Sequence, residues 1–161
     1  MPIISSEKNL DQLSFTFVAE FPVDVHRVWQ LWADPRQLER WWGPPSWPAT
    51  FDRHDFAVGG GSRYHMTGPD GELAPGWWRF TAIDEPTRLE FDDGFSDQAG
   101  EPDASMPTIQ VVVTIEAVGS GTRMTATSRF VSIEQLDQLA AMGMEEGMRE
   151  AMGQIDALLV G

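Results

Sequence analysis

The sequence of 161 residues contains no cysteine. This absence excludes disulfides, a thiolate nucleophile and cysteine-ligated metal sites. The three histidines, His26, His54 and His65, are scattered and do not have the spacing of a metal-binding motif. We therefore expect the protein to hold neither a metal nor another cofactor.

Basic residues are also scarce, with ten Arg and one Lys against 25 acidic residues and a net charge of −14. A surface that could neutralise phosphates is missing, so we expect no nucleic-acid partner. No apolar run approaches the roughly 20 residues of a membrane span, and residues 1–12 lack the cationic start and apolar run of a signal peptide. We expect a cytoplasmic protein that does not insert into membranes.

What the chain does contain is apolar and aromatic material for one core. Residues of the apolar types make up 42% of the sequence, and 17 residues are aromatic. A chain of this length and composition is typical of one globular domain. We expect a polar N-terminal tail at residues 1–12 and a single domain at residues 13–161.

The pattern after the tail is that of an antiparallel sheet interrupted by two short helices. Alternation from Leu13 to Ala19 predicts a first strand, apolar spacings of three and four from Val25 to Trp32 predict a helix, and Asp34 precedes a second helix at Pro35–Trp41. Tight-turn residues separate the later strand-like runs, which implies an antiparallel meander. These runs are Ala49–Phe56, Ser62–Thr67, Gly76–Asp84, Arg88–Phe95, Thr108–Ala117 and Thr122–Phe130. The acidic segment Ser96–Pro107 predicts a long mobile loop.

The C-terminal region predicts one long amphipathic helix. Ser132 and Gln135 form a capping-box pattern, and apolar residues then recur at intervals of three or four up to Leu159. A continuous helix over Ile133–Leu159 would be ~40 Å long and would have to lie across the sheet. Internal glycines predict a kink near Gly143–Gly147.

A helix lying over a curved sheet predicts an apolar cavity between the two. The last strand carries small residues, and the helix presents methionines spaced by four, a flexible residue type suited to irregular ligands. The alternative is that these side chains, like the tryptophans, simply fill the core. In each of the pairs Trp41-Trp42 and Trp77-Trp78, at most one ring faces the cavity. We predict ligand contacts for Trp42, Tyr64, Met66, Trp78, Phe80, Phe91, Met124, Met144, Met148 and Met152.

Evidence for catalysis is weak. Tyr64 and His65 are candidates for proton transfer within an apolar cavity, but the period of a strand places them on opposite faces, and the sequence does not say which face is inward. A triad with Ser128 lacks a nucleophile elbow. We therefore assign no catalytic residue.

Six short motifs occur in order along the chain. They are Asp34-Pro35-x-x-Leu38-x-x-Trp41-Trp42-Gly43-Pro44, Val58-Gly59-Gly60, Gly68-Pro69-Asp70-Gly71-Glu72, Pro86-x-Arg88-Leu89, Gly121-Thr122-x-Met124 and Gly143-Met144-Glu145-Glu146-Gly147-Met148. Together they resemble the START-like (SRPBCC) superfamily, in the branch of activator of heat-shock-protein-90 ATPase homologues that includes the calicheamicin-resistance type. The resemblance covers about Phe15 to Leu159. It implies an α+β helix-grip fold, in which a curved antiparallel sheet of six to seven strands wraps around the C-terminal helix and encloses a ligand cavity.

The resemblance narrows the function less than the fold, because one fold hosts many activities. Members of the superfamily bind lipids and polyketides, act as aromatases or cyclases, or activate chaperones. We expect binding or sequestration of a small hydrophobic or aromatic ligand, lipid-like or polyketide-like, as the main role. The alternatives are a cyclase, aromatase or hydrolase acting in the same cavity, and an interaction module like a chaperone-ATPase activator. The sequence leaves open whether the protein forms a homodimer.

Overall fold

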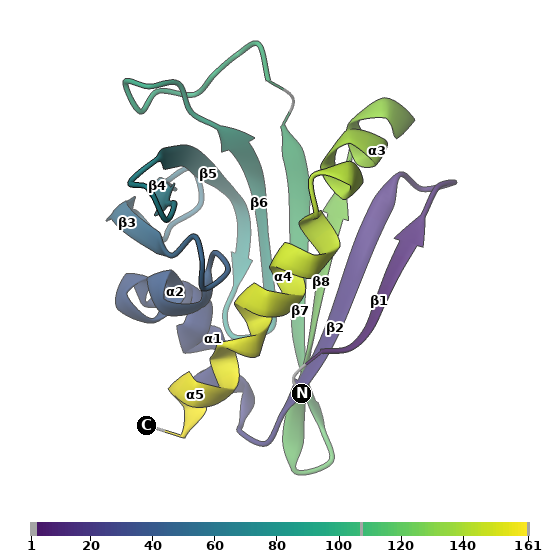
Figure 1. Cartoon of the computed structure of the whole chain (residues 1–161). Helices are drawn as coiled ribbons and strands as arrows, with labels where there is room; N and C mark the ends of the chain where they lie inside the picture. The colour runs from purple at the N-terminus through teal and green to yellow at the C-terminus, as the bar shows by residue number, and fades with distance from the viewer. Residues whose placement is uncertain (1–2, 107, 161) are drawn as a thin grey trace.

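The computed structural model describes residues 3–106 and 108–160, and in it eight strands form one antiparallel sheet (Figure 1). The order across the sheet is β1-β2-β8-β7-β6-β5-β4-β3. Strands that follow one another in the sequence are neighbours in the sheet, except that β2 pairs with β8 instead of β3. The strands are β1 (Ile3–Asn9), β2 (Ser14–Phe21), β3 (Ala49–His54), β4 (Gly61–Thr67), β5 (Leu73–Asp84), β6 (Arg88–Phe95), β7 (Ile109–Val118) and β8 (Gly121–Arg129). The predicted curved antiparallel sheet is confirmed.

Strand β1 corrects the prediction of an N-terminal tail. Residues 3–9 pair with β2, with Ser6 opposite Phe17, and extend the sheet from the expected six or seven strands to eight. Met1 and Pro2 of the expected tail lie outside the described residues. The segment escaped prediction because an edge strand is held by backbone hydrogen bonds to its neighbour, which do not require an alternating apolar pattern.

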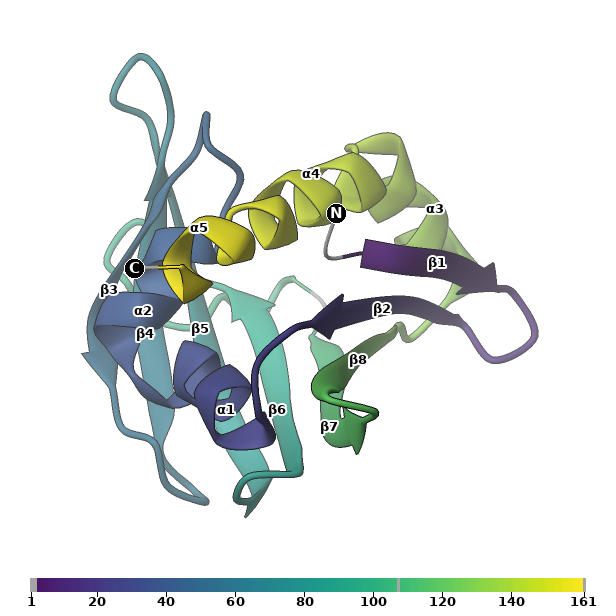
Figure 2. The ribbon, with the colours of Figure 1, turned by 90° about the horizontal axis from the view of Figure 1, so that it is seen from below.

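The two short helices form where they were expected, α1 at Val25–Ala33 and α2 at Pro35–Trp41. Each begins at an aspartate: Asp24 accepts a hydrogen bond from the Arg27 N–H and Asp34 from the Arg36 N–H, both at 2.9 Å. These caps satisfy backbone donors that the first turn of a helix leaves free. Both helices pack on the concave side of the sheet (Figure 2), α1 against β7 and β8 and α2 against β3.

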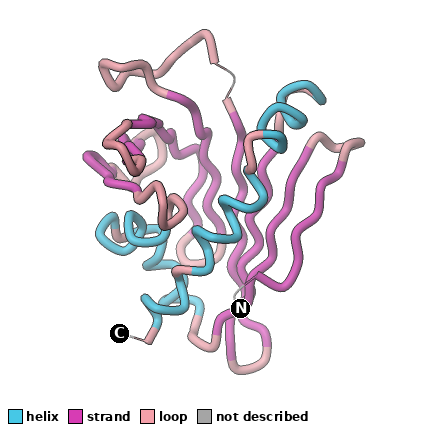
Figure 3. Tube along the Cα trace, viewed as in Figure 1, coloured by secondary structure: helices cyan, strands magenta, loops and turns pink. Residues whose placement is uncertain are grey.

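The C-terminal helix is present but is not continuous. It consists of α3 (Ile133–Ala141), α4 (Met144–Gly153) and α5 (Ile155–Leu159), and α4 crosses the concave side of the sheet diagonally (Figures 1 and 3). The predicted cap holds, since the Ser132 hydroxyl accepts from the Gln135 N–H at 3.1 Å. The main break falls at Gly143, inside the interval predicted for a kink, where φ is 86°. The prediction of one continuous helix was wrong because a left-handed residue ends the helical hydrogen-bond ladder.

Aromatic side chains fill much of the concave side between α1, α2 and the sheet. Trp32 and Trp41 meet edge to face at 4.8 Å between centroids, and Trp78 stacks on Phe91 at 4.2 Å. All four are at most 2% exposed, so this cluster excludes water from that end of the fold. Space under the C-terminal helices can therefore remain only toward α3 and α4.

The loop between β6 and β7 is present over residues 96–106, while Pro107 lies outside the described residues. Its mobility remains a prediction. Among the described residues, no helix combines the length and the apolar character needed to cross a membrane.

The break in the C-terminal helix generates a matched pair of substitutions. Gly143→Ala forces a side chain into the left-handed region and should destabilise the protein by about 1 kcal/mol, whereas Gly147→Ala, inside α4 with open space at the added methyl group, should stabilise it by about 0.5–1 kcal/mol. Urea unfolding at a common pH measures both. Equal effects of the two substitutions would contradict the assigned break.

Candidate functional site

A cavity of about 130 Å³ lies between the C-terminal helices and the concave face of the sheet. Leu139 of α3 and three methionines of α4 form its helical wall, and β2, β6, β7 and β8 form its floor. Trp32 and Trp42, from α1 and the residue after α2, close one side. The lining residues are Phe17, Trp32, Trp42, Asp93, Ile109, Val111, Ala126, Ser128, Leu139, Met144, Met148 and Met152.

Four of the side chains predicted to contact a ligand line this cavity: Trp42, Met144, Met148 and Met152. The methionines lie along one side of α4 because residues spaced by four share a helical face. The small residues predicted to leave space on the last strand, Ala126 and Ser128, form part of the floor.

Other predicted contacts lie in the packed core instead. Trp78, Phe80, Phe91 and Met124 are at most 2% exposed and do not line the cavity. The Met124 sulfur accepts a hydrogen bond from the Trp32 indole N–H at 3.2 Å, so this methionine is held as core. The other three, Trp78, Phe80 and Phe91, pack on one another, and these ring contacts hold them in the core.

Met66, another predicted contact, also lies outside this cavity lining. It is partly buried against the core, beside Gly43, where a side-chain carbon added to the glycine would lie 3.5 Å from the Met66 Cγ. It belongs to β4, where it pairs with Ala49 of β3 and Ala74 of β5.

The tryptophan pairs divide between faces as their spacing predicts. Trp41 is fully buried and its indole N–H donates to the Leu31 carbonyl at 2.9 Å, while Trp42 faces the cavity. Trp77 turns to the outer face of the sheet, where its N–H donates to the Phe95 carbonyl at 3.1 Å, and Trp78 packs inside.

The polar centre of the cavity is Asp93, which the sequence reasoning missed. Tyr64 donates its hydroxyl hydrogen to an Asp93 carboxylate oxygen at 3.2 Å. Burial raises the pKa of Asp93 to about 7, against the opposing effect of the Tyr64 hydroxyl and the nearby Trp78 indole N–H. The side chain keeps an intermediate exposure because its carboxyl borders the cavity, so water there can still reach it.

A signal for Asp93 was present in the sequence. Leu89 and Phe91 in β6 point inward, and period two puts Asp93 on the same face. A carboxyl that continues an apolar face is unusual and identifies a candidate functional group.

Tyr64 is positioned by a glycine in the next strand. Gly76 is paired with it, and a side-chain carbon there would come within 2.5 Å of the Tyr64 ring. Burial first, and then the Asp93 charge, raise the pKa of Tyr64 well above its usual value. The tyrosine therefore serves as a neutral hydrogen-bond donor to Asp93.

Two indole donors near this pair lack a partner. The N–H groups of Trp42 and Trp78 are buried and make no hydrogen bond to any described residue. Both N–H groups lie near enough to Tyr64 to lower its pKa, and that of Trp78 also lowers the pKa of Asp93, but neither N–H has the geometry of a hydrogen bond. A buried donor without a partner is costly, and the one on Trp42 belongs to a ring that lines the cavity.

The second catalytic candidate, His65, is remote from the cavity. It points to the outer face and its Nδ1 lies 3.0 Å from the Asp52 carboxylate. His54, which sequence reasoning did not single out, is held between the Ser62 hydroxyl at 2.7 Å and the Trp32 carbonyl at 3.0 Å. Burial lowers its pKa, which suits a neutral residue that joins α1 to the sheet. Within the ranges that the structure describes, no group of three or more His, Asp or Glu residues is arranged to hold a metal ion.

The family assignment follows from a match between residues 22–160 and the model of a protein family described as "Activator of Hsp90 ATPase homolog 1-like protein". The chain belongs to this family. The resemblance carried by the six motifs is confirmed, and the helix-grip fold with it.

Solved structures similar to this family member support the same fold. A protein from Arthrobacter aurescens is 57% identical, with a TM-score of 0.93 over 98% of this chain and 91% of that one. A protein from Mycobacterium smegmatis is 47% identical, with a TM-score of 0.90 over 98% and 97% of the two chains. One from Staphylococcus epidermidis is 26% identical, with a TM-score of 0.84 over 97% and 93%. No protein with a curated description matches this chain.

The raised pKa of Asp93 predicts a specific pH dependence. Between about pH 4 and pH 7 the folded state retains a proton that the unfolded state has released, so this group lowers the free energy of unfolding as the pH rises through that window. The difference between 3.8 and about 7 corresponds to at most about 4 kcal/mol. Asp93→Asn should remove this decline and be the more stable protein at pH 8, as measured by urea unfolding across the pH range.

Asp92→Asn, on the other face of the same strand, is the matched control and should keep the decline that Asp93 causes. Burial also lowers the pKa of His54, but His54 is present in all three proteins, so the difference between their profiles isolates Asp93. Parallel profiles for Asp93→Asn and wild type would contradict a protonated carboxyl in the cavity.

Proposed function

We propose that the protein binds a small apolar or aromatic molecule that carries one hydrogen-bonding group, in the cavity under α4. The observation that carries this proposal is an apolar cavity bordered by a single carboxyl and by a tryptophan whose indole N–H has no partner among the described residues. An apolar site with a few convergent polar groups is the usual form of a ligand pocket.

The volume sets the size of the ligand. A cavity of about 130 Å³ is close to the roughly 150 Å³ that accommodates benzene in an engineered protein core. A single substituted ring therefore fits. The lipid-like or polyketide-like ligand expected from the resemblance needs several times this space, so its binding requires α3 and α4 to move away from the sheet.

The polar groups set the orientation. A ligand hydroxyl can donate to the Asp93 carboxyl, and a ligand oxygen can accept from the Trp42 indole N–H, which removes the cost of an unpaired buried donor. Burying about 150 Å² of ring surface contributes about 4 kcal/mol, which corresponds to a Kd of about 1 mM before the polar contacts are added.

A second candidate function is proton transfer in the same cavity, as in a cyclase, aromatase or hydrolase. A carboxyl whose pKa is about 7, next to the Tyr64 hydroxyl, favours it, because general acid–base catalysis is most effective when the pKa lies near the working pH. The catalytic group would then be Asp93 with Tyr64, and not His65. A rate that follows a carboxyl titrating near pH 7 and is abolished in Asp93→Asn would separate catalysis from binding alone.

The third candidate, activation of a chaperone ATPase, comes from the family description alone. No contact or surface among the described residues favours it over ligand binding.

Met148→Trp tests the placement of the ligand. The larger ring should occupy the cavity and weaken the binding of phenol, the probe, at least tenfold, while the fold is retained. Met142→Trp is the matched control, because Met142 is 69% exposed at the helix break and should leave binding unchanged. Titration followed by NMR shifts of the Trp42 indole N–H measures affinity, and near-ultraviolet circular dichroism checks folding.

Anisole, which lacks the hydroxyl donor, should bind more weakly than phenol. Equal phenol affinity in wild type and Met148→Trp would remove this cavity from consideration.

A further inference from the structure

A second hollow, of about 910 Å³, lies on the outer face of the sheet, opposite the side covered by α4. Outward-pointing residues in direct register across four strands form its floor: Arg79 of β5, Asp92 of β6, Gln110 of β7 and Arg129 of β8. The turn before β4 and the loop after β6 contribute to its sides. This hollow, called the outer groove below, shares no residue with the cavity under α4.

The outer groove concentrates positive charge in an acidic protein. Four of the ten arginines line it, Arg53, Arg63, Arg79 and Arg129, together with Asp55 and Asp92. Its lining carries a formal charge of +2, which becomes +1 when Glu101, the ion-pair partner of Arg63, is included, while the remaining chain carries −15. At physiological ionic strength exposed charges farther than about 8 Å are largely screened, so an anion in the groove experiences mainly this local surplus.

Three of these arginines have no partner among the described residues. Within residues 3–106 and 108–160, the side chains of Arg53, Arg79 and Arg129 make no hydrogen bond and no ion pair. By contrast, Arg88 and Arg123, also on the sheet, pair with glutamates at 2.8 Å. Guanidinium groups in the groove are therefore available to an external anion.

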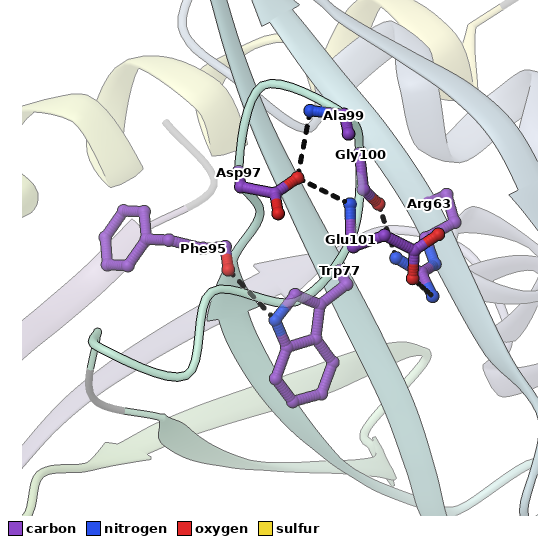
Figure 4. A network of polar contacts seen from close by, with 7 residues as sticks. All are labelled: Arg63, Trp77, Phe95, Asp97, Ala99, Gly100 and Glu101. Carbon is purple, nitrogen blue, oxygen red and sulfur yellow. Dashed lines mark hydrogen bonds and ion pairs between the residues drawn. The ribbon is translucent and has the colours of Figure 1, made fainter.

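The fourth arginine is used to hold the loop after β6. Arg63 donates to the Gly100 carbonyl and lies 3.6 Å from the Glu101 carboxylate (Figure 4). Asp97 accepts from the N–H groups of Ala99 at 2.9 Å and Glu101 at 3.0 Å, which fixes the loop backbone that Arg63 grips. The loop, whose Pro102 lines the groove, is thus braced by hydrogen bonds before any ligand enters.

Trp77 supplies a fixed aromatic surface beside the free arginines. It pairs with Arg63 across the strands and lies two residues from Arg79 on the same face. Gly94 leaves room for its ring, since a side-chain carbon there would come within 2.4 Å of the indole, and the bond to the Phe95 carbonyl sets the ring orientation (Figure 4). A ring held in place loses little entropy when a ligand packs on it.

We propose that the outer groove binds a small aromatic anion, with its ring against Trp77 and its anionic group at Arg79 and Arg53. Guanidinium groups form strong, directional hydrogen bonds with carboxylates and phosphates, and aromatic rings pack favourably with each other and with Arg. The site is separate from the ligand cavity under α4 and does not depend on the function proposed for it.

The test uses benzoate as the probe, with phenyl phosphate in a second titration and neutral benzyl alcohol as the uncharged analogue. Benzoate should shift the Trp77 indole N–H signal in NMR spectra of the full chain, and benzyl alcohol should bind at least tenfold more weakly. Arg79→Gln should weaken benzoate binding about tenfold. Arg40→Gln removes the same charge from α2, outside the groove, and should have no effect.

Met148→Trp, which fills the inner cavity, should leave benzoate binding intact. Stronger binding of phenyl phosphate than of benzoate would identify the favoured anion as a phosphate, within the same proposal. Equal binding of benzyl alcohol and benzoate, unchanged affinity in Arg79→Gln, or loss of binding in Met148→Trp would each overturn it.

Discussion

The packing of indole and phenyl rings between α1, α2 and the sheet determines where anything else can bind. Trp32, Trp41 and Trp78 are almost completely buried, and their edge-to-face and stacked contacts fill that end of the concave face. The C-terminal helices pass over the other end, where β8 carries the small residues Ala126 and Ser128. The cavity is therefore the part of the concave space that the aromatic rings leave unfilled. Its position follows from the distribution of large and small side chains along the strands.

Asp93 shows how one polar group changes the chemistry of such a space. In an otherwise apolar wall the carboxyl loses hydration, and its pKa rises to about 7 even though Tyr64 donates a hydrogen bond to it. Desolvation thus outweighs the hydrogen bond, which is the order expected for a buried acid with no cation beside it. The protein carries a destabilising group where an apolar residue would pack, and a cost of this kind is typical of functional sites.

Most of the fold could be predicted from the sequence, because alternation, turn residues and helix caps are local signals. Asp24, Asp34 and Ser132 cap helices where their positions indicated. Strand β1 could not be found this way, since a polar edge strand has no apolar face. The cavity was harder still: alternation placed Phe80, Phe91 and Met124 on the inward face, but which inward residues border empty space depends on how far Trp32 and Trp78 reach across the sheet. Asp93 was recoverable by continuing the face of Phe91 by one more step.

The two faces of the sheet suit different ligands because the same strands carry opposite chemistry on alternate residues. In β6, Asp93 faces an apolar cavity and Asp92 faces the arginine-lined groove; in β5, Trp78 packs inside and Trp77 outside. Of these two sites, the inner one is covered by a helix, α4, which begins after the break at Gly143. A ligand larger than one ring must displace α3 and α4. Its affinity is then lowered by the free energy of the contacts between these helices and the sheet, which have to be broken. The outer groove has no such cover, so its ligand does not have to displace a helix.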